Sequence, residues 1–184
     1  MRKMITQVML SIDGYFEGPH REIGWHNVDD EYNEYAAGLL DSAGAIIFGR
    51  HTYELMSNYW PTKTAIENDP VIANRMNQLP KIVFSKSLKK IEWDHTRLLK
   101  EADKEEIIRL KEQSAMDLVV LGSANLVSYL SNLGVIDEYQ VMINPLVLGK
   151  GRPYFQEPQK LILNRQKTKV FRSGNVLLCY HPIR

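Results

Sequence analysis

The stretch Ile46-Ile47-Phe48-Gly49-Arg50-His51-Thr52-Tyr53-Glu54 has the pattern of a buried strand, a glycine and the start of a helix. With Ala45, the apolar residues before the glycine form a short continuous run, which is typical of a strand covered on both faces. Such a strand belongs to a sheet that carries helices on both sides. The first turn of the following helix presents backbone N–H groups and the positive end of the helix dipole to an anion. The stretch therefore predicts an α/β sheet and a candidate phosphate site at Gly49.

Strands and helices alternate on both sides of this stretch. We expect a strand over 4–12 that ends at Asp13-Gly14, and a helix over 28–41 with Asn27 or Asp29 as its cap. Residues 60–68 show no clear pattern. Further strands are expected at 81–84, 97–99, 118–121 and 139–143, and further helices at 52–56, 70–76, 103–113 and 124–133. The last two expected strands, 161–171 and 176–180, have no helix between them, so the sheet should be parallel in its first part and antiparallel at its end.

The composition of the chain argues for a globular protein and against nucleic-acid-binding and membrane proteins. The chain has 184 residues, 44% of them hydrophobic, which suits one globular domain spanning 1–184. With 23 Lys+Arg against 22 Asp+Glu, the near-zero net charge argues against nucleic acid or an anionic membrane as partner. No apolar run approaches the roughly 20 residues of a membrane span, and no signal peptide is evident. We expect a cytoplasmic protein that binds a small molecule.

The cysteine and histidine residues of the sequence indicate neither a disulfide nor a metal site. Cys179 is the single cysteine, so no intramolecular disulfide forms, and its apolar neighbours indicate a buried structural thiol. His20 and His26, with Asp29 and Asp30, are metal-ligand residue types, but their spacing fits no zinc pattern. We expect loop histidines and no metal.

Two strand exits have the same strand-glycine-helix arrangement. In open α/β sheets, ligands bind beyond the carboxyl ends of the strands. At Gly49 and at Gly122 a buried strand ends and a helix begins, and two such phosphate sites fit a dinucleotide. The alternative is that both are tight turns without a ligand, because neither G-x-G-x-x-G nor a Walker loop occurs in the sequence. The side chains that follow the two glycines supply charge, hydroxyl groups or close backbone approach: Arg50, His51 and Thr52 at the first, Ser123, Ala124 and Asn125 at the second.

These residues resemble a known family. The stretch 46–54 is similar to the strand and helix start of dihydrofolate reductases, in which Arg-His-Thr, an aromatic residue and Glu follow the glycine. Ser11-Ile12-Asp13-Gly14, Leu121-Gly122-Ser123, Asp137-Glu138 and 145–155 resemble the reductase domain at the C-terminus of the riboflavin-biosynthesis deaminase-reductase, RibD. These motifs cover nearly the whole chain, which is identified as a member of the dihydrofolate reductase-like superfamily. The resemblance implies a three-layer α/β/α fold with NADPH lying across the sheet edge.

The resemblance also implies which residues hold the cofactor. Ser85 and Lys86 would border the adenosine 2′-phosphate, where cationic donors select NADPH over NADH. This sequence has Gly122-Ser123 where the family usually has two glycines, so the second residue must reach its conformation with a Cβ present. The cofactor phosphates would be contacted by Gly49, Arg50, His51 and Thr52, and the pyrophosphate would be cradled by Gly122, Ser123, Ala124, Asn125 and Leu126.

The substrate side follows from the same resemblance. In dihydrofolate reductases a carboxylate on the first helix, a few residues after a Trp, hydrogen-bonds the pteridine ring; Trp25 and Asp30 have similar positions. If buried with a raised pKa, the Asp30 carboxyl would supply or relay the proton that accompanies hydride addition. The alternative is a solvated acid favoured by the helix dipole.

Two further residues are candidates for substrate binding. In riboflavin-type reductases the residue at the position of Asp13 faces the ligand, although Asp-Gly is also an ordinary turn pair. Tyr53, with Tyr59 and Trp60, would line a ring-binding cleft, although aromatic residues at helical spacing usually belong to a core.

The sequence thus predicts an NADPH-dependent reductase. Its expected substrate is a small heterocycle, either a pyrimidine of the 5-amino-6-(5-phosphoribosylamino)uracil type or a pterin, and residues 145–155 favour the riboflavin-type branch. The alternative is a nucleotide-binding protein of the same fold without turnover. The resemblance also implies a homodimer, with the C-terminal strands at the contact.

Overall fold

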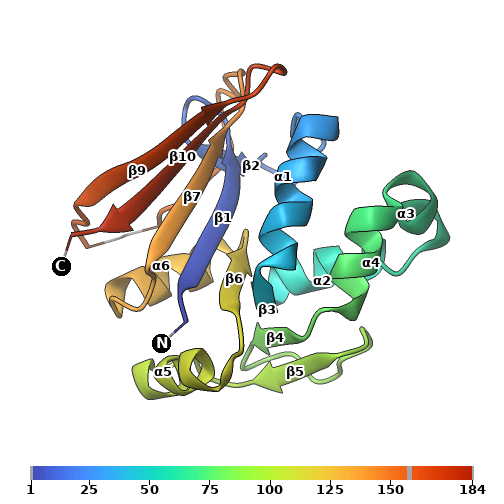
Figure 1. Ribbon diagram of the computed structural model, residues 1–184, viewed down its shortest axis with the longest axis vertical. Coiled ribbons are helices and arrows are strands. Elements are labelled where there is room, and N and C mark those ends of the chain that lie inside the picture. The colour runs from blue at the N-terminus through green and yellow to red at the C-terminus, as the bar shows by residue number, and fades with distance from the viewer. Residues whose placement is uncertain (1, 157–158, 184) are drawn as a thin grey trace.

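The computed structural model describes residues 2–156 and 159–183. Its centre is an eight-stranded sheet in the order β5-β4-β3-β6-β1-β7-β10-β9 (Figure 1). The strands from β5 to β7 pair in parallel, whereas β10 pairs antiparallel with both β7 and β9, which confirms the predicted mixed sheet. The strands are β1 (Met4–Leu10), β3 (Ala43–Gly49), β4 (Lys81–Phe84), β5 (Thr96–Leu99), β6 (Asp117–Leu121), β7 (Glu138–Ile143), β9 (Leu163–Val170) and β10 (Val176–Pro182).

Helices cover both faces of the sheet. Helices α1, α2 and α4 pack on one face, and α5 and α6 pack on the other (Figure 1). This confirms the expected three-layer α/β/α fold. No helix of the described residues is long and apolar enough to span a bilayer. The helices are α1 (Asp30–Asp41), α2 (Arg50–Tyr59), α3 (Lys63–Asn68), α4 (Pro70–Gln78), α5 (Lys104–Gln113) and α6 (Ala124–Asn132).

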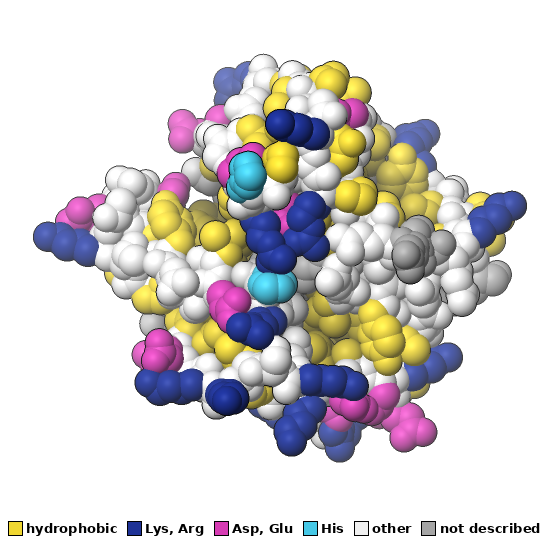
Figure 2. All heavy atoms as spheres, turned by 180° about the vertical axis from the view of Figure 1, so that it is seen from behind, with side chains coloured by type: hydrophobic (Ala, Val, Ile, Leu, Met, Phe, Trp, Pro, Cys, Tyr) yellow, Lys and Arg dark blue, Asp and Glu magenta, His cyan; other side chains and the backbone are white. Residues whose placement is uncertain are grey.

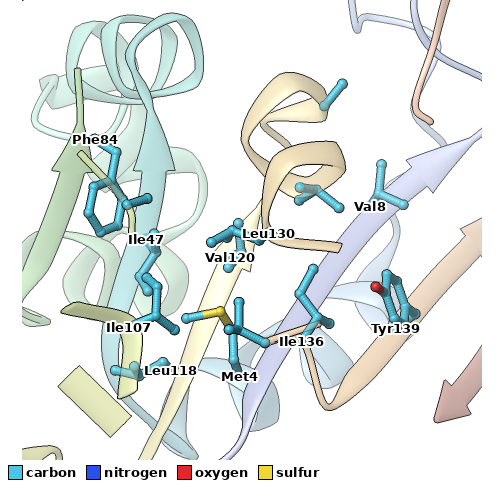
Figure 3. Close-up of a cluster of buried hydrophobic side chains, with 14 of the residues drawn as sticks. Met4, Val8, Ile47, Phe84, Ile107, Leu118, Val120, Leu130, Ile136 and Tyr139 are labelled. Atoms are coloured by element: carbon cyan, nitrogen blue, oxygen red, sulfur yellow. The ribbon is translucent and has the colours of Figure 1, made fainter. Parts of the chain in front are cut away.

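The apolar runs of the central strands are continuous because successive side chains enter different cores. In β3, Ile47 belongs to the cluster that contains Leu130 of α6 (Figure 3). Its neighbours Ile46 and Phe48 point the other way and join Ile72 of α4. Successive residues thus meet opposite helical layers, so no position of the strand is left for a polar side chain.

Capping side chains set the helix boundaries. Helix α1 begins at Asp30 rather than Val28 because the Asp29 carboxylate accepts a hydrogen bond from the Tyr32 N–H at 2.8 Å. Helix α2 begins at Arg50, directly after Gly49 and earlier than expected. The pattern-poor segment 60–68 contains the short helix α3, so its lack of periodicity hid a real element.

A second, small sheet escaped prediction. Strand β2 (Tyr15–Glu17) pairs antiparallel with β8 (Arg152–Pro153). The close approach requires glycine at Gly151, because a Cβ there would lie 2.5 Å from the Glu17 carbonyl oxygen. Glu17 Oε1 forms an ion pair with Arg152 Nη1 at 2.8 Å. This pairing brings the glycine-rich segment after β7 to the carboxyl ends of the parallel strands.

Candidate active site

Two adjoining cavities lie beyond the carboxyl ends of the parallel strands. The larger cleft, of about 660 Å³, lies between the starts of α2 and α6 and the exit of β4. The smaller pocket, of about 400 Å³, lies between β1 and the helices α1, α2 and α4. Phe16, Glu17, Thr52 and Leu55 line both, so molecules bound in the two cavities would meet at these residues.

The larger cleft brings together all of the predicted cofactor-binding residues except Gly122, which lines the smaller pocket. Gly122 has a φ of +52°, and a Cβ there would lie 3.4 Å from Thr52 Cγ2, so glycine suits both the conformation and the space. The predicted residues that line the larger cleft are Gly49, Arg50, His51, Thr52, Ser85, Lys86, Ser123, Ala124, Asn125 and Leu126.

The larger cleft is rich in basic side chains. Figure 2 shows the face behind that of Figure 1, where Lys and Arg side chains gather around a histidine near the centre. Exposed basic groups at a helix start favour a polyanionic ligand. The basic residues in the lining of the larger cleft are Arg21, Arg50, Lys86, Lys100 and Arg152.

Arg50 and Lys86 are held in place but remain exposed. Arg50 donates from Nε to Glu54 Oε1 at 2.7 Å and from Nη1 to Ser87 Oγ at 2.8 Å. Lys86 Nζ lies 2.9 Å from Glu101 Oε1, and this hydrogen bond raises the pKa of the lysine. Both side chains are positioned by neighbours at the rim, and both keep access to an anion from solvent.

Ser123 joins the two strand exits. It adopts a left-handed conformation, with φ 59° and ψ 53°, which is strained for a residue with a Cβ. Its Oγ accepts a hydrogen bond from Gly49 N–H at 2.9 Å, and its own N–H donates to Thr52 Oγ1 at 3.1 Å. The expectation that both helix starts present free N–H groups is therefore wrong for Gly49 and Ser123, because the serine that replaces the second glycine links them.

A pair of substitutions separates strain from hydrogen bonding at Ser123. Ser123→Ala keeps the strained conformation and loses the Oγ acceptor, so it should lower the free energy of unfolding by about 1–2 kcal/mol. Ser123→Gly loses the same acceptor but relieves about 1–2 kcal/mol of left-handed strain, so it should stay close to the wild type. Urea denaturation followed by circular dichroism measures both, and equal stability of the two variants would contradict this account.

The smaller pocket is mainly apolar and aromatic, with a few polar groups. Gln7 Nε2 is buried and has no hydrogen-bond partner among the described residues. Burial raises the pKa of Tyr32 to about 12, and the Gln7 side chain only partly opposes this rise, so the phenol stays neutral. Asn33 Nδ2 donates to Asp69 Oδ1 at 3.1 Å. These groups come from β1, α1 and the start of α4, and they converge only in the folded chain.

His26 also lines the smaller pocket, where burial lowers the pKa of its imidazole from 6.5 to about 4. Between these values the unfolded chain binds more protons than the folded chain, so stability rises with pH across this window and is lost on acidification. We expect a loss of about 1–2 kcal/mol between pH 6.5 and pH 4, a value reduced for solvent around the ring. Thermal melts across this range test it: His26→Gln should flatten the curve, and an unchanged slope would exclude His26 as its source.

The predicted catalytic carboxylate is not in the pocket. Asp30 is the first residue of α1, is exposed, and lines neither cavity. The expectation of a buried carboxylate at Asp30 is wrong because this residue occupies the first turn of the helix, where the dipole favours a solvated acid. Trp25 lines neither cavity either; its Nε1 donates to the Glu22 carbonyl at 3.2 Å.

The other two predicted substrate residues have structural positions. Asp13 is exposed and accepts hydrogen bonds from the N–H groups of Leu148 at 3.0 Å and Gly149 at 2.8 Å. Hydrogen bonding by the Ser11 side chain and by these N–H groups lowers the pKa of Asp13 to about 2. Tyr53 is 3% exposed and its hydroxyl accepts from backbone N–H groups at 92–93, so it belongs to the core. Asp13 thus occupies a turn position and Tyr53 a core position in the fold.

Three pocket residues were missed or set aside in the sequence. Gln7 interrupts the apolar run of β1, and a polar residue in a strand that is buried on both faces was the available signal. Glu17 stands in a strand too short to predict, and His26 was interpreted as a loop residue. No local spacing connects these three positions, so only the fold shows that they share one cavity.

Comparison with known proteins identifies the family of this chain. The family model of the RibD C-terminal domain matches residues 2–179. The chain belongs to the RibD C-terminal domain family. A similar relative is the uncharacterized protein YyaP of Bacillus subtilis (strain 168), 28% identical over 181 residues that cover 98% of this chain and 95% of YyaP.

Solved structures show the same fold. A protein from Shewanella sp. PV-4 named for riboflavin biosynthesis superposes with a TM-score of 0.77 at 20% identity, covering 99% of each chain. Dihydrofolate reductase from Enterococcus faecalis, solved with NADP(H), has a TM-score of 0.67 at 14% identity, covering 99% of this chain and 97% of the reductase. At these identities the likeness shows the fold alone.

Proposed function

We propose that this protein is an NADPH-dependent reductase that adds a hydride and a proton across a C=N or C=O bond of a small heterocyclic or sugar-amine substrate. One observation carries the proposal: a basic cleft of dinucleotide size opens directly onto an aromatic pocket of ring size, and the two share Thr52 and Leu55. NADPH, when bound, supplies the hydride from its nicotinamide ring and leaves as NADP⁺. The residues of the chain hold both partners in place and exclude water.

The cofactor residues fit the chemistry of NADPH. Arg50 and Lys86 carry the charges that the phosphates of a dinucleotide need, and Gly122 leaves room for close backbone approach. Lys86 stands at the exit of β4, where the resemblance puts the 2′-phosphate that distinguishes NADPH from NADH. The proposed cofactor site comprises the predicted residues that line the larger cleft, with Gly122 at its inner end.

On the substrate side, the proposal is a pyrimidine or pterin ring in the smaller pocket. The neutral phenol of Tyr32 donates a hydrogen bond to a ring nitrogen or oxygen as negative charge develops there during hydride addition. Apolar groups such as Leu39, Met56 and Trp60 cover the remaining surface of the pocket and keep water from the reacting atoms.

The test is a screen of NADPH oxidation with dihydropterins and aminouracils as acceptors, combined with calorimetric binding of NADPH and NADH. Oxidation that depends on an acceptor, with tight NADPH and weak NADH binding, supports the reductase. Binding without oxidation by any acceptor favours the alternative, a nucleotide-binding protein without turnover. Failure to bind either nucleotide refutes both.

We also propose a cytoplasmic homodimer with the C-terminal strands at the contact. Strand β9 lies at the edge of the sheet, with Val170 70% exposed at its last residue and Ile162 and Ile183 exposed together at its opposite end. Light scattering should therefore give twice the mass of one chain, and Val170→Asp should shift the protein towards the monomer. A wild type that is monomeric at high concentration would rule out the dimer.

A further inference from the structure

The two cavities differ in the positively charged side chains that line them. Among residues 2–156 and 159–183, no Lys or Arg lines the smaller pocket, whereas the larger cleft has several. The acidic residues of the smaller pocket are Glu17 and Asp69. Arg152, at the boundary, is already paired with Glu17 at 2.8 Å. His26 is neutral at pH 7 because burial lowers its pKa to about 4.

This lining is unfavourable for an anion. A phosphate or carboxylate that enters a mostly apolar cavity loses its hydration and needs a cation or several N–H donors in exchange. The start of α4 faces the smaller pocket, but its N-cap residue is Asp69, whose carboxylate repels an approaching anion.

In contrast, one buried donor is open to a neutral ligand. Gln7 is 7% exposed, lies in the middle of the sheet between β6 and β7, and lines the smaller pocket. Its Nε2 is buried and forms no hydrogen bond of good geometry among the described residues. The Tyr32 hydroxyl is close enough for the Gln7 side chain to lower the pKa of the phenol, but it does not satisfy this donor, which is costly until an acceptor meets it. A ring carbonyl oxygen or an unprotonated ring nitrogen supplies that acceptor, and the Tyr32 phenol beside it supplies a second polar contact.

We infer that the smaller pocket takes an uncharged one- or two-ring heterocycle that presents an acceptor atom to Gln7, and that it discriminates against substrates with a phosphate or carboxylate tail. The inference rests on the proposed function for the identity of this pocket as the substrate site. Its volume of about 400 Å³ lies at the small end of ligand pockets and suits such rings. Within the substrate class proposed above, it selects the unphosphorylated members.

The test uses matched ligand pairs. The protein is saturated with NADP⁺, and calorimetry measures binding of 5-amino-6-(ribosylamino)uracil against its 5′-phosphate, and of 6-methyl-7,8-dihydropterin against dihydrofolate with its glutamate tail. We expect the charged member of each pair to bind at least about tenfold more weakly. A charged member that binds as tightly as its neutral partner, or no binding by any of the four, overturns the inference.

Variants sharpen the test. Gln7→Leu removes the unpaired amide, so it folds at least as well as the wild type, binds NADPH as before, and loses about tenfold or more in ring affinity. Val28→Arg introduces a cation at the exposed rim of the smaller pocket and should recover binding of the phosphorylated uracil. Val71→Arg on α4 is the matched control, since Val71 is equally exposed and lines neither cavity. Rescue by both arginines, or by neither, contradicts the inference.

The two proposals fail in different ways. Preference for neutral rings without NADPH oxidation would refute the reductase and leave the assignment of the smaller pocket intact. Oxidation that proceeds only with the phosphorylated or glutamylated members would refute this inference and leave the reductase intact.

Discussion

Lys81→Met should lower the free energy of unfolding by about 3–5 kcal/mol, the largest effect that we expect from a single substitution. Lys81 is 1% exposed, and its Nζ donates to the carbonyl oxygens of Met76 at 2.8 Å, Asn77 at 3.0 Å and Leu79 at 2.8 Å. These carbonyls lie at the end of α4, whose last turn also carries Arg75. The Arg75 guanidinium is paired with Asp41 and donates to the Val71 carbonyl, so Lys81 is the basic group that meets these three carbonyls. Nζ also lies 4.5 Å from the ring centroid of Trp93.

Methionine fills nearly the same volume, so the loss isolates the ammonium rather than the packing of the stem. Burial lowers the pKa of Lys81 to about 8, so the group is still charged at pH 7. Urea denaturation followed by tryptophan fluorescence gives the free energy of unfolding. Lys63→Met, at an exposed position in α3, is the control and should change it little. A loss below about 1 kcal/mol for Lys81→Met would mean that water satisfies the three carbonyls.

The burial of Lys81 could not be predicted from the sequence. The run 81–84 was predicted as a strand from its apolar residues, and the strand is there, but a lysine before such a run is normally expected in solvent. Its burial depends on the end of α4 lying across the start of β4, a contact that no local pattern encodes. Continuous apolar runs identify the strands of this sheet because both faces are covered, whereas tertiary partners of single polar side chains stay hidden.

The two cavities also differ in how far their residues could be predicted from the sequence. The predicted residues of the larger cleft follow the ends of β3, β4 and β6 in sequence. The strand-glycine-helix pattern indicated those after β3 and β6, and the family resemblance added Ser85, Lys86 and Leu126. The smaller pocket is assembled from single side chains of β1, β2 and several helices. Trp25, Asp30 and Tyr53 were predicted for it by their positions in the chain. In the fold Trp25 donates a hydrogen bond to the Glu22 carbonyl, Asp30 is exposed in the first turn of α1, and Tyr53 is buried in the core.

Arg50→Ala should weaken NADPH binding by about ten- to a hundredfold, because it removes a cation at the start of α2 where the helix dipole also favours an anion. The fold should be unaffected, since Arg50 is exposed and its partners Glu54 and Ser87 lie at the surface. Arg165→Ala, on the exposed edge strand β9, is the matched control and should leave binding unchanged.

Nucleotide selectivity then separates the roles of the two cations in the cofactor site. If Arg50 contacts phosphates that NADPH and NADH have in common, Arg50→Ala weakens both, and added salt reduces the difference from wild type because the interaction is screened. If Lys86 borders the 2′-phosphate, Lys86→Ala weakens NADPH alone and brings its affinity towards that of NADH. Calorimetric titration of the two variants with both nucleotides gives four dissociation constants. Equal losses for NADPH and NADH in Lys86→Ala would move the 2′-phosphate away from the exit of β4, and unchanged binding in Arg50→Ala would remove the larger cleft as the cofactor site.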